Sequence, residues 1–189
     1  MSAHAIVLAA GAGRRFGGGK LLASWNGRPL IAWSVEAAKA SGVDAVTVVL
    51  GADAEKITAY LGEDVRIVRC HDWEEGMAAS LRCGIQSLPD GAEAALIFLA
   101  DMPDVSPALG RTLLEKVLSG APAALATYDR APAHPAAVGA SAFPLLASLH
   151  GDRGGRDVLA ALHGAVQIVT DWPGSTFDID RPDDLSRQR

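Results

Sequence analysis

The sequence predicts a three-layer α/β fold, in which a mainly parallel β-sheet carries helices on both faces. Several apolar runs have the length of strands, and most are apolar almost continuously, as a strand must be when helices cover both of its faces. Segments with helical periodicity stand between these runs, as parallel strands require. The runs are residues 5–10, 45–51, 65–70, 94–101, 123–129 and 165–171.

End signals place the helices between these strands. Pro29 suits the first position of a helix that ends at Gly42, and Ser106 before Pro107 is typical of a cap and first turn. That second helix should run to Leu118. Further helices are expected at residues 54–61 and 77–88, on both sides of residues 151–155, and after Asp180.

Length and charge exclude several classes of protein. A chain of 189 residues predicts one domain, residues 1–189. The formal net charge of −5 argues against a general nucleic-acid or anionic-membrane surface. The spacing of Cys70 and Cys83 matches neither a zinc site nor a disulfide framework. No apolar run is long enough to cross a membrane and no targeting signal is evident, so we expect a soluble cytoplasmic protein.

A glycine-rich loop follows the first predicted strand. Residues 8–20, LAAGAGRRFGGGK, combine five glycines with three cations. Glycines let backbone N–H groups turn toward one anion, and Arg or Lys adds charge at its oxygens. Phe16 replaces the third glycine of a dinucleotide-binding fingerprint, and Leu21 replaces the Ser or Thr of a Walker loop. The loop therefore predicts a phosphate site of another kind, with a flexible turn and solvated arginines as the alternative.

Acidic residues stand at the ends of two extended segments. Asp101 ends the most apolar run, and Asp178 and Asp180 follow the last extended stretch. Open α/β sheets bind ligands at the carboxyl ends of their strands, and Mg²⁺ takes one or two carboxylates together with phosphate oxygens. An Asp at a strand end can equally form a turn or cap a helix, so the residues alone leave both interpretations open.

The glycine-rich loop resembles the opening signature of the nucleotidyltransferases, LAAGxGxRxGxxK. The resemblance implies a Rossmann-like nucleotidyltransferase fold in which this loop wraps a nucleoside triphosphate, with Arg15 and Lys20 in catalytic roles at the phosphates. All fixed positions of the signature are present: Leu8, Ala9, Ala10, Gly11, Gly13, Arg15, Gly17 and Lys20.

Two acidic motifs extend this resemblance. The family binds its metal through a DMP motif and a late D-I-D-x-P-x-D-L motif, and both stand here, at residues 101–103 and 178–185. The resemblance implies Mg²⁺ held by the catalytic Asp101 together with Asp178 or Asp180. Ala100 and Arg181 depart from the glycine and threonine that are usual in these motifs.

Further stretches are similar to the molybdenum cofactor cytidylyltransferases, among the MobA-like nucleotidyltransferases. Residues 74–85 resemble their GMxxSLxxGL segment, which implies that the Ser80 hydroxyl meets the cytosine edge. Residues 133–139 and 149–159 resemble acceptor-binding segments, which implies that His134, Arg153 and Arg156 serve a phosphorylated acceptor. The alternatives are a Ser80 that caps a helix and a helix-to-helix turn with exposed arginines. The tryptophans, including Trp73, are interpreted as packing residues.

The family resemblance implies a reaction and its partners. CMP passes from CTP to the terminal phosphate of molybdopterin, the molybdenum cofactor, and pyrophosphate is released. Residues 1–105 would form the nucleotide-binding half and residues 106–189 the acceptor-binding half. A molybdoenzyme or its chaperone would be a partner, whereas nucleic acid and membranes would not. The alternatives are a nucleotidyltransferase that uses GTP or another phosphorylated acceptor, and a non-catalytic cofactor-binding maturation protein for molybdoenzymes.

Overall fold

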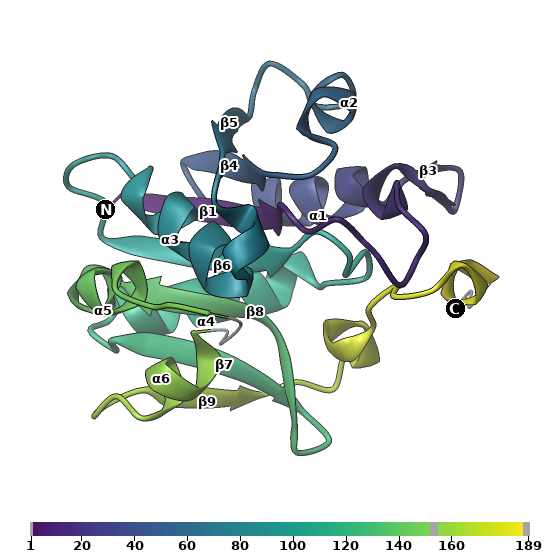
Figure 1. The fold of residues 1–189 in the computed structure, drawn as a ribbon. Helices are drawn as coiled ribbons and strands as arrows, with labels where there is room; N and C mark the ends of the chain where they lie inside the picture. Colours follow the sequence, from purple (N-terminus) through teal and green to yellow (C-terminus); the bar gives the residue numbers. More distant parts are fainter. Residues whose placement is uncertain (1, 152–154, 187–189) are drawn as a thin grey trace.

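A seven-stranded sheet with strand order β5-β4-β1-β6-β8-β7-β9 organises the molecule (Figure 1). The computed structural model describes residues 2–151 and 155–186. Every neighbouring pair is parallel except those of β8, which runs antiparallel to β6 and β7. The predicted, mainly parallel sheet is therefore confirmed. Its strands are β1 (Ala3–Ala9), β4 (Ala45–Leu50), β5 (Arg66–Arg69), β6 (Ala94–Leu99), β7 (Ala123–Tyr128), β8 (Ala131–Gly139) and β9 (Val166–Val169).

Helices cover both faces of this sheet, as predicted. On one face lie α1 (Leu30–Lys39) and α4 (Pro107–Leu118), with the short α2 (Ala54–Thr58) beside them. On the other face lie α3 (Met77–Gln86), α5 (Phe143–Ala147) and α6 (Arg156–Ala160). The alternation of β1 divides the core accordingly, because Val7 packs with the first layer and Ile6 with the second.

Short elements complete the chain. A small hairpin joins β2 (Ser24–Trp25) to β3 (Arg28–Pro29). The 3₁₀ turns of the described residues are η1 (Lys20–Leu22), η2 (Trp73–Glu75), η3 (Ala140–Ala142), η4 (Pro173–Thr176) and η5 (Pro182–Ser186). The helix expected after Asp180 is thus a 3₁₀ turn. None of the helices in the described ranges is long and apolar enough to cross a membrane.

The strand β8 is the main element that the sequence did not predict. Pro132 and Pro135 interrupt its ladder, and its apolar residues neither alternate nor include many β-branched side chains. It forms because Asp129 and Arg130, both at positive φ, turn the chain back onto β7. The pairing of β7 with β8 then shifts register between Leu125 and Ala126.

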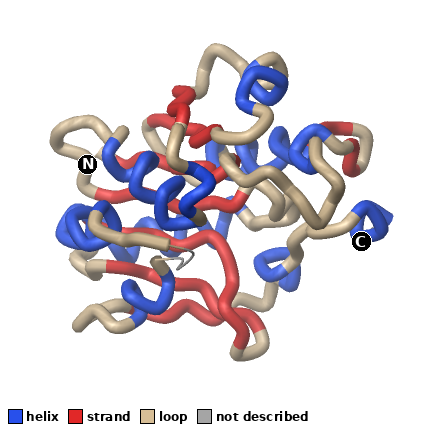
Figure 2. The backbone as a smooth tube through the Cα atoms, viewed as in Figure 1, coloured by secondary structure: helices blue, strands red, loops and turns tan. Residues whose placement is uncertain are grey.

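The carboxyl ends of β1 and β6 open at one end of the sheet. Figure 2 shows the loop after β1 at this end, beside the C-terminal segment that follows η4. In an α/β sheet this is the end that binds ligands. Segments near residues 15, 101 and 180 therefore meet here, although they lie far apart in the sequence.

Gly84 lets α3 lie directly against the sheet beneath this end. A Cβ built on Gly84 would stand 2.5 Å from Ile6 Cγ2 and 3.2 Å from Val49 Cγ2. Both partners are fully buried strand residues, so neither can move aside without disturbing the core. The close approach sets the height of α3, and with it the position of Ser80.

We expect Gly84→Ala to lower the free energy of unfolding by roughly 1–3 kcal/mol, the usual cost of overpacking a core. This loss should appear even though Ala favours a helix over Gly by about 1 kcal/mol. Urea denaturation measures it, with Gln86→Ala, an exposed change on the same helix, as the control. An unchanged stability for Gly84→Ala would contradict the close approach of α3.

Candidate functional site

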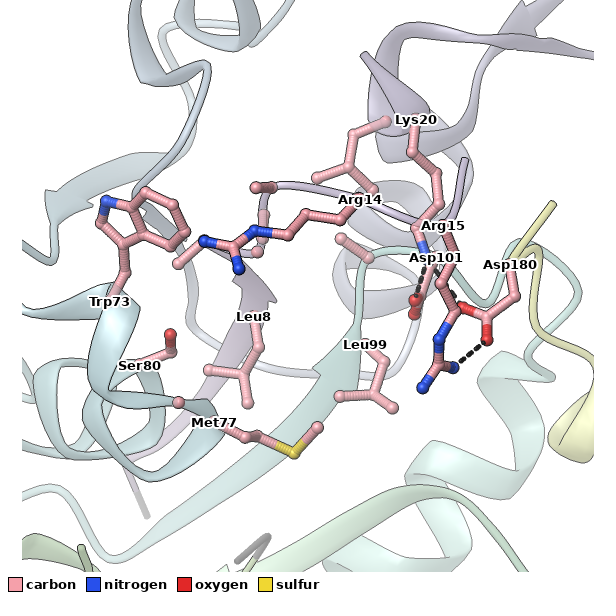
Figure 3. Close-up of a pocket in the computed structure, with 18 of the residues that line it drawn as sticks. Leu8, Arg14, Arg15, Lys20, Trp73, Met77, Ser80, Leu99, Asp101 and Asp180 are labelled. Atoms are coloured by element: carbon pink, nitrogen blue, oxygen red, sulfur yellow. Dashed lines mark hydrogen bonds and ion pairs between the residues drawn. The ribbon is translucent and has the colours of Figure 1, made fainter. Parts of the chain in front are cut away.

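A cavity of about 550 Å³ opens at the carboxyl end of the sheet (Figure 3). The loop after β1, the end of β6, the start of α3 and the C-terminal segment form its walls. Most residues predicted for the site meet there: Leu8, Ala9, Ala10, Gly11, Gly13, Arg15, Lys20, Ser80, Asp101 and Asp180. The cavity thus combines the glycine-rich loop with both acidic motifs.

Lys20 joins the loop to both acidic motifs. Its Nζ lies 2.6 Å from Asp101 Oδ2 and 3.2 Å from Asp180 Oδ1. Gly13 makes room for the lysine stem, since its φ is +59° and an added Cβ would stand 2.9 Å from Lys20 Cβ. Burial by itself lowers the pKa of Lys20, but the two carboxylates outweigh burial and raise the pKa above its usual value.

Ser34 holds the backbone around Asp101. Its fully buried hydroxyl donates to the carbonyl oxygen of Ala100 at 3.1 Å and lies 3.2 Å from that of Met102. These contacts satisfy carbonyls that the end of β6 leaves outside the sheet ladder. Sequence reasoning missed Ser34, although a serine on the buried stripe of a predicted helix is a signal that could have identified it.

The C-terminal segment reaches the cavity through a backbone hydrogen bond. The N–H of Ile179 donates to the carbonyl oxygen of Asp101 at 3.0 Å, and the Ile179 side chain is fully buried against Trp25 and Leu30. The Asp184 carboxylate accepts from the N–H groups of Asp180 and Arg181, at 3.0 and 2.7 Å. These contacts place Asp180 at the edge of the cavity.

Asp180 and Asp178 lie in different electrostatic surroundings. Burial raises the pKa of Asp180, but hydrogen bonds from Arg15, at 2.8 Å, and from Lys20 outweigh it and hold the pKa below its usual range. Asp178 does not line the cavity; burial, then the charges of Asp180 and Asp101, raise its pKa. Asp180 is thus the better placed of the two to share a cation with Asp101.

The donor chemistry at this point fits a hard divalent cation. Asp101 and Asp180 already share one positive charge, the ammonium of Lys20. Within residues 2–151 and 155–186, no three His, Cys, Asp or Glu side chains are grouped as a metal site. Two carboxylates match Mg²⁺, which takes its remaining ligands from water and phosphate oxygens.

The other end of the cavity has a different character. Trp73 and Met77 line it together with Ser80, whose hydroxyl points into the space (Figure 3). Arg14 extends toward this end, whereas Arg15 turns to Asp180. The Trp73 ring lies over Gly51, where an added Cβ would stand 2.5 Å from ring carbon Cγ. Trp73 therefore packs, as predicted, and also forms a wall of the cavity.

Sequence reasoning missed Arg14, Trp73 and Met77 as residues of the cavity. Arg14 occupies a variable position of the signature, so only its place beside Arg15 hinted at a role. Trp73 and Met77 flank the glycine at the start of α3, and their exposure to the cavity depends on how that helix meets the sheet. That arrangement carries no local sequence signal.

Two of the residues predicted to bind the acceptor lie outside this cavity. His134 and Arg156 do not line the cavity, and Arg153 falls outside the described residues. Arg156 donates to the carbonyl oxygens of Ala133, at 2.7 Å, and Ala126, which form the cross-strand pair next to the register shift between β7 and β8. Its guanidinium therefore supports the strand pair. Its role toward an acceptor stays a prediction.

His134 stands between two charges. Burial, then the positive charge of Arg156, lower the pKa of His134 to about 4, and the negative charge of Asp101 opposes them in part. Its Nδ1 is buried and has no hydrogen-bond partner within the described part of the chain. The imidazole is therefore neutral at pH 7, close enough to Asp101 to feel its charge.

Comparison with known proteins identifies the class. Rv0371c from Mycobacterium tuberculosis superimposes with a TM-score of 0.88 at 28% identity, over 99% of this chain and 96% of that one. A nucleotidyl transferase from Methanothermobacter thermautotroptrophicus superimposes with a TM-score of 0.74 at 26% identity, over 97% and 94%. The architecture is therefore a Rossmann-like nucleotidyltransferase fold.

The family follows from the sequence match. Residues 5–166 match the MobA-like NTP transferase domain, and this chain belongs to that family. Nicotine blue oxidoreductase of Paenarthrobacter nicotinovorans is 32% identical over 192 residues, which cover 96% of this chain and 94% of that protein. Rv0371c has also been solved in complex with manganese; that structure gives a TM-score of 0.83 at 25% identity, over 99% and 97%.

The pKa of His134 predicts a pH dependence of stability. Its folded-state pKa of about 4 lies below the usual 6.5, so between these values the unfolded chain binds a proton that the folded chain does not. This contribution to stability is complete above pH 6.5 and is lost as the pH falls toward 4. The slope should approach, at most, about 1.4 kcal/mol per pH unit.

Urea denaturation at pH 7.0, 5.5 and 4.5 tests this expectation. His134→Gln should flatten the dependence, whereas His163→Gln, at an exposed position, should keep it. An equally steep loss of stability in His134→Gln would assign the titration to another group.

Proposed function

We propose that this chain is an Mg²⁺-dependent cytidylyltransferase that moves CMP from CTP to molybdopterin and releases pyrophosphate. One observation carries the proposal: the cations of the glycine-rich loop and the carboxylates of both acidic motifs meet in one cavity. A triphosphate needs such cations, and its metal needs such carboxylates. Membership of the MobA-like NTP transferase family supports the same reaction type.

The reaction requires the protein to position the two substrates and to neutralise their negative charge. It needs no covalent intermediate. An oxygen of the acceptor phosphate attacks the α-phosphorus of CTP in line, the bond to the bridging oxygen breaks, and pyrophosphate leaves with its electron pair. Arg15 and Lys20 would hold the triphosphate and neutralise charge on the leaving group. Asp101 and Asp180 would hold Mg²⁺, which when bound supplies further neutralisation at the phosphates.

The choice of CTP rests on the end of the cavity that holds Ser80. Its hydroxyl can donate to or accept from the cytosine edge, and the Trp73 ring offers an apolar wall for a base. The choice of molybdopterin rests on the similarity of residues 133–139 and 149–159 to acceptor-binding segments. A structural neighbour from Archaeoglobus fulgidus, molybdopterin-guanine dinucleotide biosynthesis protein A, is 24% identical and supports the fold alone.

The two halves of the chain would then bind different substrates. Residues 1–105 supply most of the cavity, and residues 106–189 would supply the acceptor site near His134 and Arg156. The product would pass to a molybdoenzyme or its chaperone in the cytoplasm.

Pyrophosphate release with CTP, GTP, ATP and UTP, each with molybdopterin and Mg²⁺, tests the proposal. CTP should give the highest kcat/KM. A higher value with GTP would change the base assignment, and no release with any nucleotide would contradict catalysis. A parallel arm that offers nicotine blue as the substrate tests the activity for which the relative from Paenarthrobacter nicotinovorans is named.

Asp101→Asn should lower turnover by at least about a hundredfold, the scale of losing one transition-state electrostatic contact. The change keeps the shape of the side chain, so the fold should remain intact by circular dichroism. Asp90→Asn, at an exposed position, is the matched control and should keep wild-type turnover. Full activity of Asp101→Asn, or of the wild type in EDTA, would contradict the proposed dependence on a metal.

Ser80→Ala should reduce the preference for CTP over GTP by about tenfold, because a site built on a hydrogen bond discriminates through that bond. The measurement is the ratio of kcat/KM values for the two nucleotides. Ser87→Ala is the control: this serine, just beyond α3, bonds the carbonyl of Gly84 at 2.7 Å and does not line the cavity. An unchanged ratio for Ser80→Ala would place base recognition elsewhere.

A further inference from the structure

Where the glycine-rich loop lines the cavity, four charged side chains form one connected cluster of ion pairs. Lys20 Nζ contacts Asp101 Oδ2 at 2.6 Å and Asp180 Oδ1 at 3.2 Å, while Arg15 Nη1 contacts Asp180 Oδ2 at 2.8 Å. The Lys20 side chain is only 12% exposed, whereas that of Arg15 is 77% exposed. The lysine ammonium is therefore the central cation, and it lies between the two carboxylates.

This cluster opposes each ligand of the proposed reaction when that ligand binds alone. A divalent cation between Asp101 and Asp180 would meet the lysine ammonium at the same oxygens. A triphosphate at Lys20 and Arg15 would meet the two carboxylates that these cations already neutralise. When both ligands bind, the phosphates can pair with Lys20 and Arg15, and the metal can bind the carboxylates of Asp101 and Asp180.

We infer that the Lys20 ammonium stands at the position of the divalent cation, and that the incoming triphosphate draws this ammonium away and so frees Asp101 and Asp180 for the cation. This inference rests on the proposed function and deepens it. It makes metal and nucleotide linked ligands, each of which raises the affinity of the other by the same factor.

Two properties of the site support this exchange. A lysine carries its charge on a flexible four-carbon stem, which can swing while its base stays against Gly13. Two carboxylates leave most of the coordination shell of Mg²⁺ to phosphate and water.

The inference predicts that the Lys20 side chain has opposite effects on two binding affinities. Lys20 should weaken the binding of a divalent cation alone, and it should strengthen the binding of nucleotide. A lysine that only supported the structure would strengthen both, because its removal would disorder the carboxylates.

The test is a titration with Mn²⁺ alone, followed by electron paramagnetic resonance of the free ion, on the wild type and on Lys20→Met. Met keeps the apolar stem and removes the charge. Lys20→Met should bind Mn²⁺ at least about tenfold more tightly, and CTP without metal at least about tenfold more weakly. Equal or weaker Mn²⁺ binding in Lys20→Met would overturn the inference.

Lys39→Met is the matched control, because it removes a lysine that also pairs with one aspartate, Asp64, at 2.6 Å, away from the cavity. It changes the net charge equally and should alter neither affinity. The double variant Asp101→Asn, Lys20→Met locates the ion: it should lose the tight Mn²⁺ binding. Tight binding that persists in the double variant would place the ion elsewhere and overturn the inference.

Thermal unfolding gives a second readout. Without metal, Lys20→Met leaves Asp101 and Asp180 without their shared cation, so its Tm should fall, and Mn²⁺ should raise the Tm more than in the wild type. If Lys20→Met does not fold, Lys20→Gln, which also lacks the charge, should show the same tightening of Mn²⁺. The Mn²⁺ titration and the thermal unfolding contain no nucleotide and measure no turnover. Their outcome is therefore independent of the pyrophosphate assay, and the failure of one proposal can be told from the failure of the other.

Discussion

The ion-pair cluster around Lys20 is the interaction on which the site depends. It joins the loop after β1, the end of β6 and the C-terminal segment, three parts of the chain that lie far apart in the sequence. Without the lysine between them, the negative charges of Asp101 and Asp180 would repel each other. The cluster thus allows the carboxylates of the proposed metal site and the cations of the proposed phosphate site to share one cavity.

The surrounding fold holds this cluster through the backbone more than through side chains. Parallel pairing aligns the ends of β1 and β6, Ser34 binds the carbonyls on both sides of Asp101, and Ile179 donates to Asp101 itself. The contacts of Ser34 and Ile179 pair carbonyl groups just beyond the carboxyl end of β6, outside the sheet ladder. Buried apolar side chains therefore fix the backbone that carries the polar site, and Ile179 is the clearest example.

The two predicted halves of the site differ in how far they are assembled. The nucleotide half forms one cavity, whereas Arg156 is occupied by the carbonyls at the register shift of β7 and β8. His134 links the halves electrostatically, because the charges of both Arg156 and Asp101 act on it.

The sequence by itself determined the layer architecture, six of the seven main strands, the glycine-rich loop after the first strand and the two acidic motifs. It could do so because continuous apolar runs, helix end signals and glycine spacing are local properties of the chain. Only the tertiary structure decided that β8 inserts between β6 and β7, that Asp180 faces the cavity and Asp178 does not, and that Trp73, Met77 and Arg14 form its walls. These outcomes depend on register, on the height of a helix above a sheet, and on charges brought together from distant segments, and no local pattern records such distances.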